Sequence, residues 1–113
     1  MSENFVITDE EKLLRAIGLG MRAGAVVFGV PMICEAMKKK KAPKLVLEAS
    51  DSSDNTHKRI SDRCAFYKVK HVRLGADGMT LAAAIGKSSA VAAVAVTDAN
   101  LCRLAEQYIR SAL

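Results

Sequence analysis

The chain has 113 residues, half of them hydrophobic, and carries 17 basic against 12 acidic side chains, for a formal charge of +5. This length suits one domain with a real core and excludes two. No apolar run approaches the roughly 20 residues that span a bilayer, and no signal peptide begins the chain, so we expect a cytoplasmic protein with no membrane partner. The basic excess favours an acidic partner such as nucleic acid without establishing one.

The first part of the chain predicts two helices with a short strand between them. Thr8 and Glu11 have the spacing of a capping box, which starts the first helix. The β-branched run 25–28 predicts a brief strand at the edge of a sheet. Pro31 suits the first turn of the second helix, and the lysines at 38–41 suit its end, where cations offset the free carbonyl groups.

The central stretch KLVLEASDSSDNT, residues 44–56, passes from an apolar run directly into small polar residues. The run 45–47 predicts a central strand that is covered on both faces. The polar residues favour turns and helix N-caps, so a third helix should begin within 50–55. Ligands of open α/β sheets gather beyond the carboxyl ends of strands, which makes this corner the first candidate for a binding site.

The rest of the chain continues the alternation of helices and strands. After the third helix, 69–74 predicts a half-exposed strand and Asp77 caps a short helix. The run AVAAVAV at 90–96 predicts a second buried strand, and Asp98 caps the last helix. This alternation predicts the α/β class, as one domain (1–113) folded into a three-layer α/β/α sandwich.

The sequence pattern contains no metal-binding signature. Cys34, Cys64 and Cys102 are far apart and belong to no CxxC or CxxH pair, so we expect small buried hydrophobes in a reducing compartment. His57 and His71 have no second ligand at helical or strand spacing, and they are interpreted as ordinary loop or surface residues. We therefore assign no metal and no other cofactor.

Catalytic constellations are also missing from the pattern. An enzyme would show a nucleophile with a base, paired carboxylates, a metal cluster or a phosphate loop. Asp51 and Asp54 come nearest to a carboxylate pair, but their loop is rich in Ser and Asn, which favours helix capping over catalysis. We expect a binding module and not an enzyme.

The positive signal is a gathering of basic residues in the middle of the chain. A charge run of this kind is usually a solvated face, so by itself it leaves nucleic-acid binding about even with solvation. Its members are Lys38, Lys39, Lys40, Lys41, Lys44, Lys58, Arg59, Arg63, Lys68, Lys70 and Arg73.

Three segments, LGMRAGAVVFG (19–29), KLVLEASDSSDNT (44–56) and LAAAIGKSSAVAAVAVTD (81–98), together resemble the small bacterial YlxQ-type members of the L7Ae family of kink-turn RNA-binding ribosomal proteins. The resemblance runs from about Lys12 to Asp98. It implies that the sandwich contains a small mixed four-stranded sheet, that the protein has no catalytic activity, and that its partner is structured RNA, such as ribosomal RNA, and not DNA.

The resemblance also implies a site. Family members hold a sharply bent RNA helix with the turn after the first strand, the end of the second strand and a loop before the last strand, which correspond here to 29–36, 48–51 and 87–93. A helix N-terminus offers free N–H groups to RNA. With two lysines of the basic cluster, the expected contact residues are Gly29, Val30, Pro31, Met32, Ile33, Glu35, Lys39, Lys40, Glu48, Ser50, Asp51, Lys87, Ser88, Ser89, Ala90 and Val91.

The chain departs from the family pattern at the first of these regions. In RNA-binding members the glycine matching Gly29 is followed by polar residues that reach the bases and then by a lysine, whereas this chain has Val30, Pro31 and Met32, with Glu35 at the lysine position. Two hypotheses remain open. The protein binds another RNA feature through phosphate contacts, or it is a protein-interaction or self-association module that has lost RNA binding. We favour RNA because the basic excess suits a polyanion.

Overall fold

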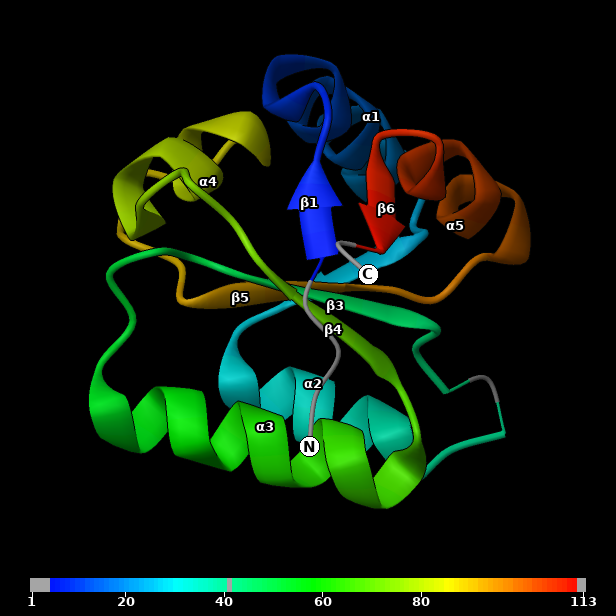
Figure 1. Cartoon of the computed structure of the whole chain (residues 1–113), viewed down its shortest axis with the longest axis vertical. Coiled ribbons are helices and arrows are strands. Elements are labelled where there is room, and N and C mark those ends of the chain that lie inside the picture. Colours follow the sequence, from blue (N-terminus) through cyan, green and yellow to red (C-terminus); the bar gives the residue numbers. More distant parts are fainter. Residues whose placement is uncertain (1–4, 41, 112–113) are drawn as a thin grey trace.

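A four-stranded mixed sheet with helices on both faces forms the body of the protein (Figure 1). The computed structural model describes residues 5–40 and 42–111. β3 is parallel to β4 and antiparallel to β5, and β5 is also antiparallel to β2. In spatial order, the strands are β2 (Val26–Phe28), β5 (Ala93–Val96), β3 (Leu45–Glu48) and β4 (Lys70–Arg73).

The helices form the two outer layers of the sandwich. Figure 1 shows α2 and α3 below the sheet and α1, α4 and α5 above it. The predicted three-layer α/β/α sandwich with a small mixed four-stranded sheet is therefore confirmed. The helices are α1 (Glu10–Arg22), α2 (Val30–Met37), α3 (Asp54–Tyr67), α4 (Gly78–Ala84) and α5 (Ala99–Glu106). None of those described combines the length and apolarity needed to cross a membrane.

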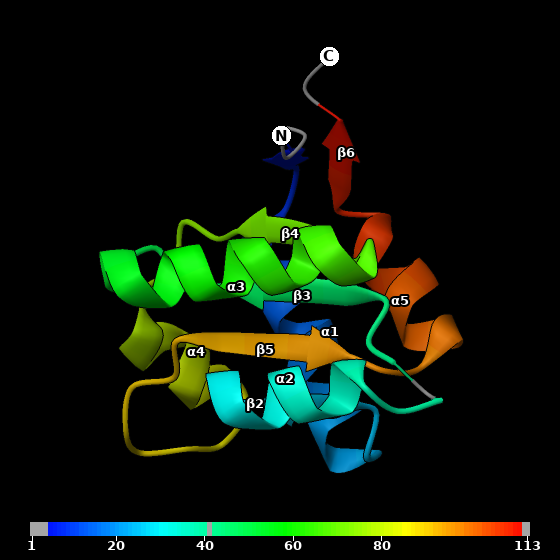
Figure 2. The ribbon, with the colours of Figure 1, turned by 90° about the horizontal axis from the view of Figure 1, so that it is seen from below.

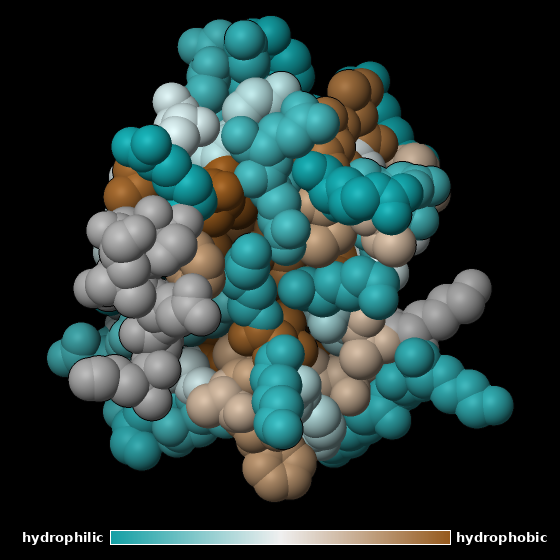
Figure 3. Space-filling view, turned by 45° about the vertical axis from the view of Figure 1, so that its right-hand side comes forward, coloured by the Kyte–Doolittle hydropathy of each residue, from teal (hydrophilic) through white to brown (hydrophobic). Residues whose placement is uncertain are grey.

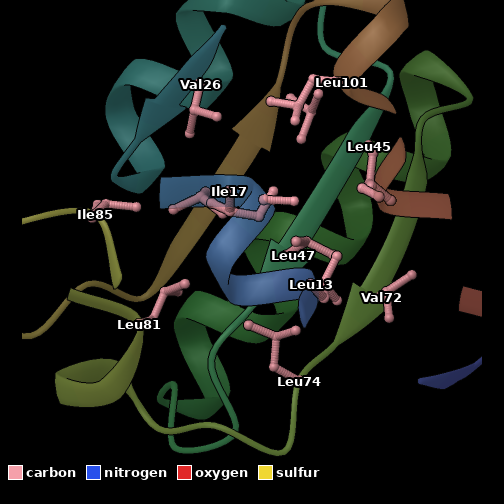
Figure 4. Packing of buried hydrophobic residues seen from close by; sticks show 14 of the residues in the cluster. Leu13, Ile17, Val26, Leu45, Leu47, Val72, Leu74, Leu81, Ile85 and Leu101 are labelled. Atoms are coloured by element: carbon pink, nitrogen blue, oxygen red, sulfur yellow. The ribbon is translucent and has the colours of Figure 1, made fainter. Parts of the chain in front are cut away.

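The apolar run of β3 is buried on both faces, as its composition predicted. Because side chains alternate along a strand, Leu45 and Leu47 join the cluster formed with α1, α4 and α5. Val46 joins the second cluster, between the sheet and α2 and α3. Figure 4 shows Leu13, Leu47 and Leu81 among the side chains of the first cluster. The sheet thus lies between two separate apolar layers.

Side-chain caps begin most of the helices, and one of them differs from the prediction. Asp9, and not Thr8, caps α1, by accepting a hydrogen bond from the Lys12 N–H at 3.1 Å. Thr8 has another role, because its N–H donates to the Tyr108 carbonyl at 2.8 Å. The predicted caps Asp77 and Asp98 are confirmed.

A second small sheet was not predicted. β1 (Phe5–Ile7) and β6 (Ile109–Ser111) pair antiparallel. The hydrogen bond from the Thr8 N–H to the Tyr108 carbonyl lies next to the Ile7–Ile109 pair and extends this pairing. The two strands come from opposite ends of the described chain and pair only with each other, and local sequence patterns do not show such a pairing.

Candidate RNA interface

The three segments that the resemblance singled out lie side by side at one end of the sheet. β5 is antiparallel to its neighbours, so it begins where β2 and β3 end. The Gly29 N–H donates to the Ala93 carbonyl at 3.0 Å, and the Ala49 N–H donates to the Ala92 carbonyl at 2.8 Å. In Figure 2 the start of α2 and the loop that leads into β5 lie together at the left. We call this region, where the resemblance predicts the RNA contacts, the RNA-facing end.

The start of α2 leaves backbone donors available at this end. Gly29 is the N-cap residue, with φ 86° and ψ 140°, and it supplies no side-chain hydrogen bond. The first N–H groups of a helix have no partner within the helix, and Pro31 has no N–H to offer. The first turn also contains no acidic residue. The N–H groups of Val30 and Met32 therefore contribute positive potential without a neighbouring carboxylate on their own turn.

The loop before β5 places a cation and two hydroxyl groups beside the start of α2. Lys87, Ser88 and Ser89 are exposed, and with Phe28 and Gly29 they line a shallow pocket of about 290 Å³. The Lys87 Nζ atom lies 4.8 Å from the centroid of the Phe28 ring, within the range of a cation–π contact. This contact holds the cation over the end of β2.

The loop after β3 is fixed to the neighbouring elements. The Asp51 carboxylate accepts a hydrogen bond from the Gly78 N–H, the first of α4, at 2.8 Å. The Ser50 N–H donates to the Ala76 carbonyl at 2.9 Å. The Arg73 guanidinium donates to the Ser50 carbonyl at 3.0 Å. Asp51 is therefore a helix-capping residue, although the helix it caps is α4 and not the adjacent α3.

Not every predicted contact residue has its side chain at the surface. Glu48, Ile33 and Val91 are buried, so their side chains support the RNA-facing end from inside. Their side chains are not available for direct contact with RNA, because Ile33 and Val91 belong to the two apolar clusters and Glu48 lies in β3, which is buried on both faces. The predicted residues that are exposed at this end are Pro31, Met32, Glu35, Ser50, Asp51, Lys87, Ser88, Ser89 and Ala90.

The predicted lysines Lys39 and Lys40 lie away from the other contact residues. They follow the last residue of α2, whereas Gly29 precedes its first, and eight residues of helix span roughly 12 Å. Figure 2 shows α2 lying across the molecule, with its start toward the left and its end toward the right. Lys41, in the same cluster, lies outside the described residues. Figure 3 turns this far end forward and shows mainly hydrophilic surface with smaller apolar areas.

Directly behind the loop after β3, two histidines converge on the buried Glu48 carboxylate. His57 Nδ1 lies 2.9 Å from both carboxylate oxygens, and His71 Nε2 lies 2.7 Å from Oε1. Ser52 donates to Oε2. Burial raises the pKa of Glu48, but the hydrogen bonds from His71, Ser52 and His57 outweigh that effect and lower the pKa to about 2.

The interpretation of both histidines as ordinary loop or surface residues is therefore wrong. His57 is on α3, and His71, on β4, has a side chain that is only 9% exposed. A signal for this cluster was present in the sequence. Glu48 follows Val46 by two residues in a strand predicted to be buried on both faces, so its carboxylate had to find polar partners inside the protein.

Two curated relatives carry an RNA-binding name. RNA-binding protein YlxQ of Bacillus subtilis (strain 168) is 39% identical over 82 residues, which cover 73% of this chain and 79% of that protein. RNA-binding protein YlxQ of Enterococcus faecium is 36% identical over 61 residues, which cover 54% of this chain and 58% of that protein.

Solved structures share the fold. A protein of unknown function from Bacillus halodurans C has a TM-score of 0.77 at 29% identity, covering 86% of this chain and 95% of that one. A Giardia lamblia 15.5kD RNA binding protein has a TM-score of 0.73 at 18% identity, covering 88% of this chain and 82% of that one, and this likeness shows the fold alone.

The sequence profile of the ribosomal protein L7Ae/L30e/S12e/Gadd45 family matches residues 11–105, which is most of the chain. The match includes all three segments at the RNA-facing end, and the YlxQ relatives agree with it. The chain therefore belongs to the ribosomal protein L7Ae/L30e/S12e/Gadd45 family, as a member of the YlxQ type.

Proposed function

We propose that this protein is a non-catalytic RNA-binding protein that holds a sharply bent RNA, such as a kink-turn in ribosomal RNA, against the RNA-facing end. The observation that carries the proposal is the convergence of the start of α2, the loop after β3 and the loop before β5 at one end of the sheet. The RNA-binding names of the YlxQ relatives support it.

Backbone donors and phosphate contacts would supply most of the binding. The free N–H groups at the start of α2 suit phosphate oxygens or base edges, and Lys87 adds a positive charge beside them. Hydroxyl groups of Ser88 and Ser89 provide further exposed donors. The apolar Met32 suits packing against an unstacked base, since RNA recognition favours distorted features over regular helix.

The test is a fluorescence titration of the protein with a kink-turn RNA and a straight duplex of equal length, at about 50 and 200 mM salt. We expect tighter binding of the kinked RNA. This preference should remain at the higher salt, because hydrogen bonds from the protein's backbone N–H groups to a bent RNA do not depend on the release of counterions. If both RNAs bound equally well and with a strong salt dependence, the protein would attract RNA through its positive charge alone and would not recognise the bend.

A second candidate function is docking of a protein partner on the same end. Met32 is 59% exposed, and Met79, next to Gly78, is also exposed. Gly78 contacts the loop after β3, which places Met79 near the RNA-facing end, and Met32 lies in the first turn of α2 at that end. Exposed apolar residues of this kind can anchor a partner. Negligible binding of both RNAs in the titration would favour this function over the first.

A further inference from the structure

The cluster of Glu48, His57 and His71 combines the ligand types of a transition-metal site. Among the described residues, these three alone form a group of histidine, cysteine or acidic side chains whose ligand atoms all lie within 4.8 Å of one another. They come from β3, α3 and β4, so the fold and not local sequence brings them together. The Glu48 carboxylate is fully buried, so it is not part of the exposed surface of the RNA-facing end.

The arrangement of the ring nitrogens around the carboxylate favours binding of a single ion by all three side chains. Both ring nitrogens lie against the Glu48 carboxylate, His57 Nδ1 at 2.9 Å from each oxygen and His71 Nε2 at 2.7 Å from Oε1. Ser52 donates to the other oxygen, Oε2, as the outer partner of a metal-bound carboxylate commonly does. No other hydrogen bond of either ring is seen among the described side chains.

The cluster is mostly buried, and its partly exposed side gives an ion a route of entry. The Glu48 side chain is fully buried, and a buried carboxylate costs stability unless positive charge or hydrogen bonds compensate it. His71 is almost buried as well, whereas the His57 side chain is 42% exposed. Among the three side chains, the site is therefore most open to solvent at His57, on the α3 side.

We propose that Glu48, His57 and His71 bind a divalent transition-metal ion of the zinc type. Two imidazole nitrogens and one carboxylate oxygen are a usual ligand set for Zn²⁺ and Co²⁺, whereas Mg²⁺ and Ca²⁺ require mainly oxygen ligands. Ligand atoms around a tetrahedral zinc lie roughly 3.3 Å apart, so the nitrogen–oxygen distances of 2.9 Å and 2.7 Å would have to lengthen to admit the ion. A water molecule would complete the coordination on the exposed side.

The metal would fasten the start of α3 and the first half of β4 to the end of β3. The loop containing Ser50 and Asp51 runs from β3 to α3, so the site would stiffen the inner side of the RNA-facing end. This role is structural and does not depend on which RNA, if any, the protein binds.

The experiment is a titration of metal-free protein with Co²⁺ and Zn²⁺, followed by visible absorption and calorimetry. We expect one Co²⁺ per chain, with the intense absorption of a tetrahedral site, displacement by Zn²⁺, and a rise in thermal stability because the ion binds the folded state. Mg²⁺ at the same concentration should produce none of these changes. A wild-type protein that binds neither Co²⁺ nor Zn²⁺ would overturn the proposal and leave a purely proton-bridged cluster.

Two variants test the site, one at a proposed ligand and one at the serine that donates a hydrogen bond to Glu48. His57→Ala removes a half-exposed ligand with little effect on the core and should abolish stoichiometric binding, while Ser52→Ala should weaken it by roughly 10–100-fold. Asp62→Asn, which removes an exposed carboxylate of α3 outside the cluster, is the matched control and should bind as the wild type does. Because His57→Ala keeps all three cysteines, unchanged metal binding by this variant would place the ion elsewhere and contradict the assignment.

Discussion

Asp51 shows how one residue of the RNA-facing end combines a structural contact with an exposed position. Its carboxylate accepts the Gly78 N–H at 2.8 Å, which satisfies one of the free donors at the start of α4. It also places a negative charge beside the proposed RNA site. The two effects can be separated by substitution, because the amide of asparagine keeps an acceptor oxygen but not the charge.

We predict that Asp51→Ala lowers the free energy of unfolding by about 1 kcal/mol, the usual cost of losing a helix-capping acceptor. Asp51→Asn should keep most of that stability and bind RNA at least as tightly as the wild type, since it removes a like charge facing the phosphates. Urea denaturation and RNA titration of both variants measure the two effects. Equal loss of stability in Asp51→Ala and Asp51→Asn would show that the Gly78 contact is not the cause.

Contacts between residues that lie near each other in the chain could be predicted from the sequence. Asp77 and Asp98 each cap the helix that follows directly, within three residues, and both were predicted. Glu48 and His71 are 23 residues apart, and Asp51 and Gly78 are 27 apart. Such pairs depend on which strands become neighbours, and local spacing does not contain that information. The same limit explains why the buried side of the candidate site was missed.

The start of α2 depends on an unusual backbone conformation at its N-cap residue, Gly29. Gly29 has φ 86° and ψ 140°, a conformation that is essentially restricted to glycine. A Cβ atom added there would meet no described atom within 4 Å, so space is not the constraint. The helix with its Pro31 and the short strand β2 were predictable from local sequence, whereas β1 and β6 were not, because they form a sheet only by pairing with each other from opposite ends of the described chain.

We predict that Gly29→Ala destabilises the protein by about 1–3 kcal/mol through backbone strain alone. It should also weaken RNA binding, because the start of α2 must shift to relieve that strain. Ala90→Gly, which changes an exposed residue of the adjacent loop without requiring a new backbone conformation, is the control and should have a much smaller effect on stability. A Gly29→Ala variant as stable as the wild type would mean that this turn tolerates a side chain.

At the scale of the whole molecule, the basic residues are divided between two ends. Lys87 lies at the RNA-facing end, while Lys39, Lys40 and Lys44 lie toward the opposite end, where the Lys44 N–H donates to the Val96 carbonyl at 2.8 Å. The formal charge of +5 does not reveal this division. A long RNA could reach both ends, so Lys39 and Lys40 remain predicted contacts for phosphates outside the bend.

Two variants with the same net charge distinguish the effect of a lysine at the RNA-facing end from the effect of the total charge of the protein. Lys87→Glu and Lys44→Glu each reduce the formal charge by two, from +5 to +3, and both residues are exposed. On an RNA just long enough to form the bend, Lys87→Glu should weaken binding by roughly tenfold or more, because it removes a charged contact to phosphate, whereas Lys44→Glu should change it little. The salt dependence should flatten by about 0.7–0.9 in slope only for the change at Lys87. Equal weakening by both variants would show that the protein attracts RNA through its overall charge and not through the RNA-facing end.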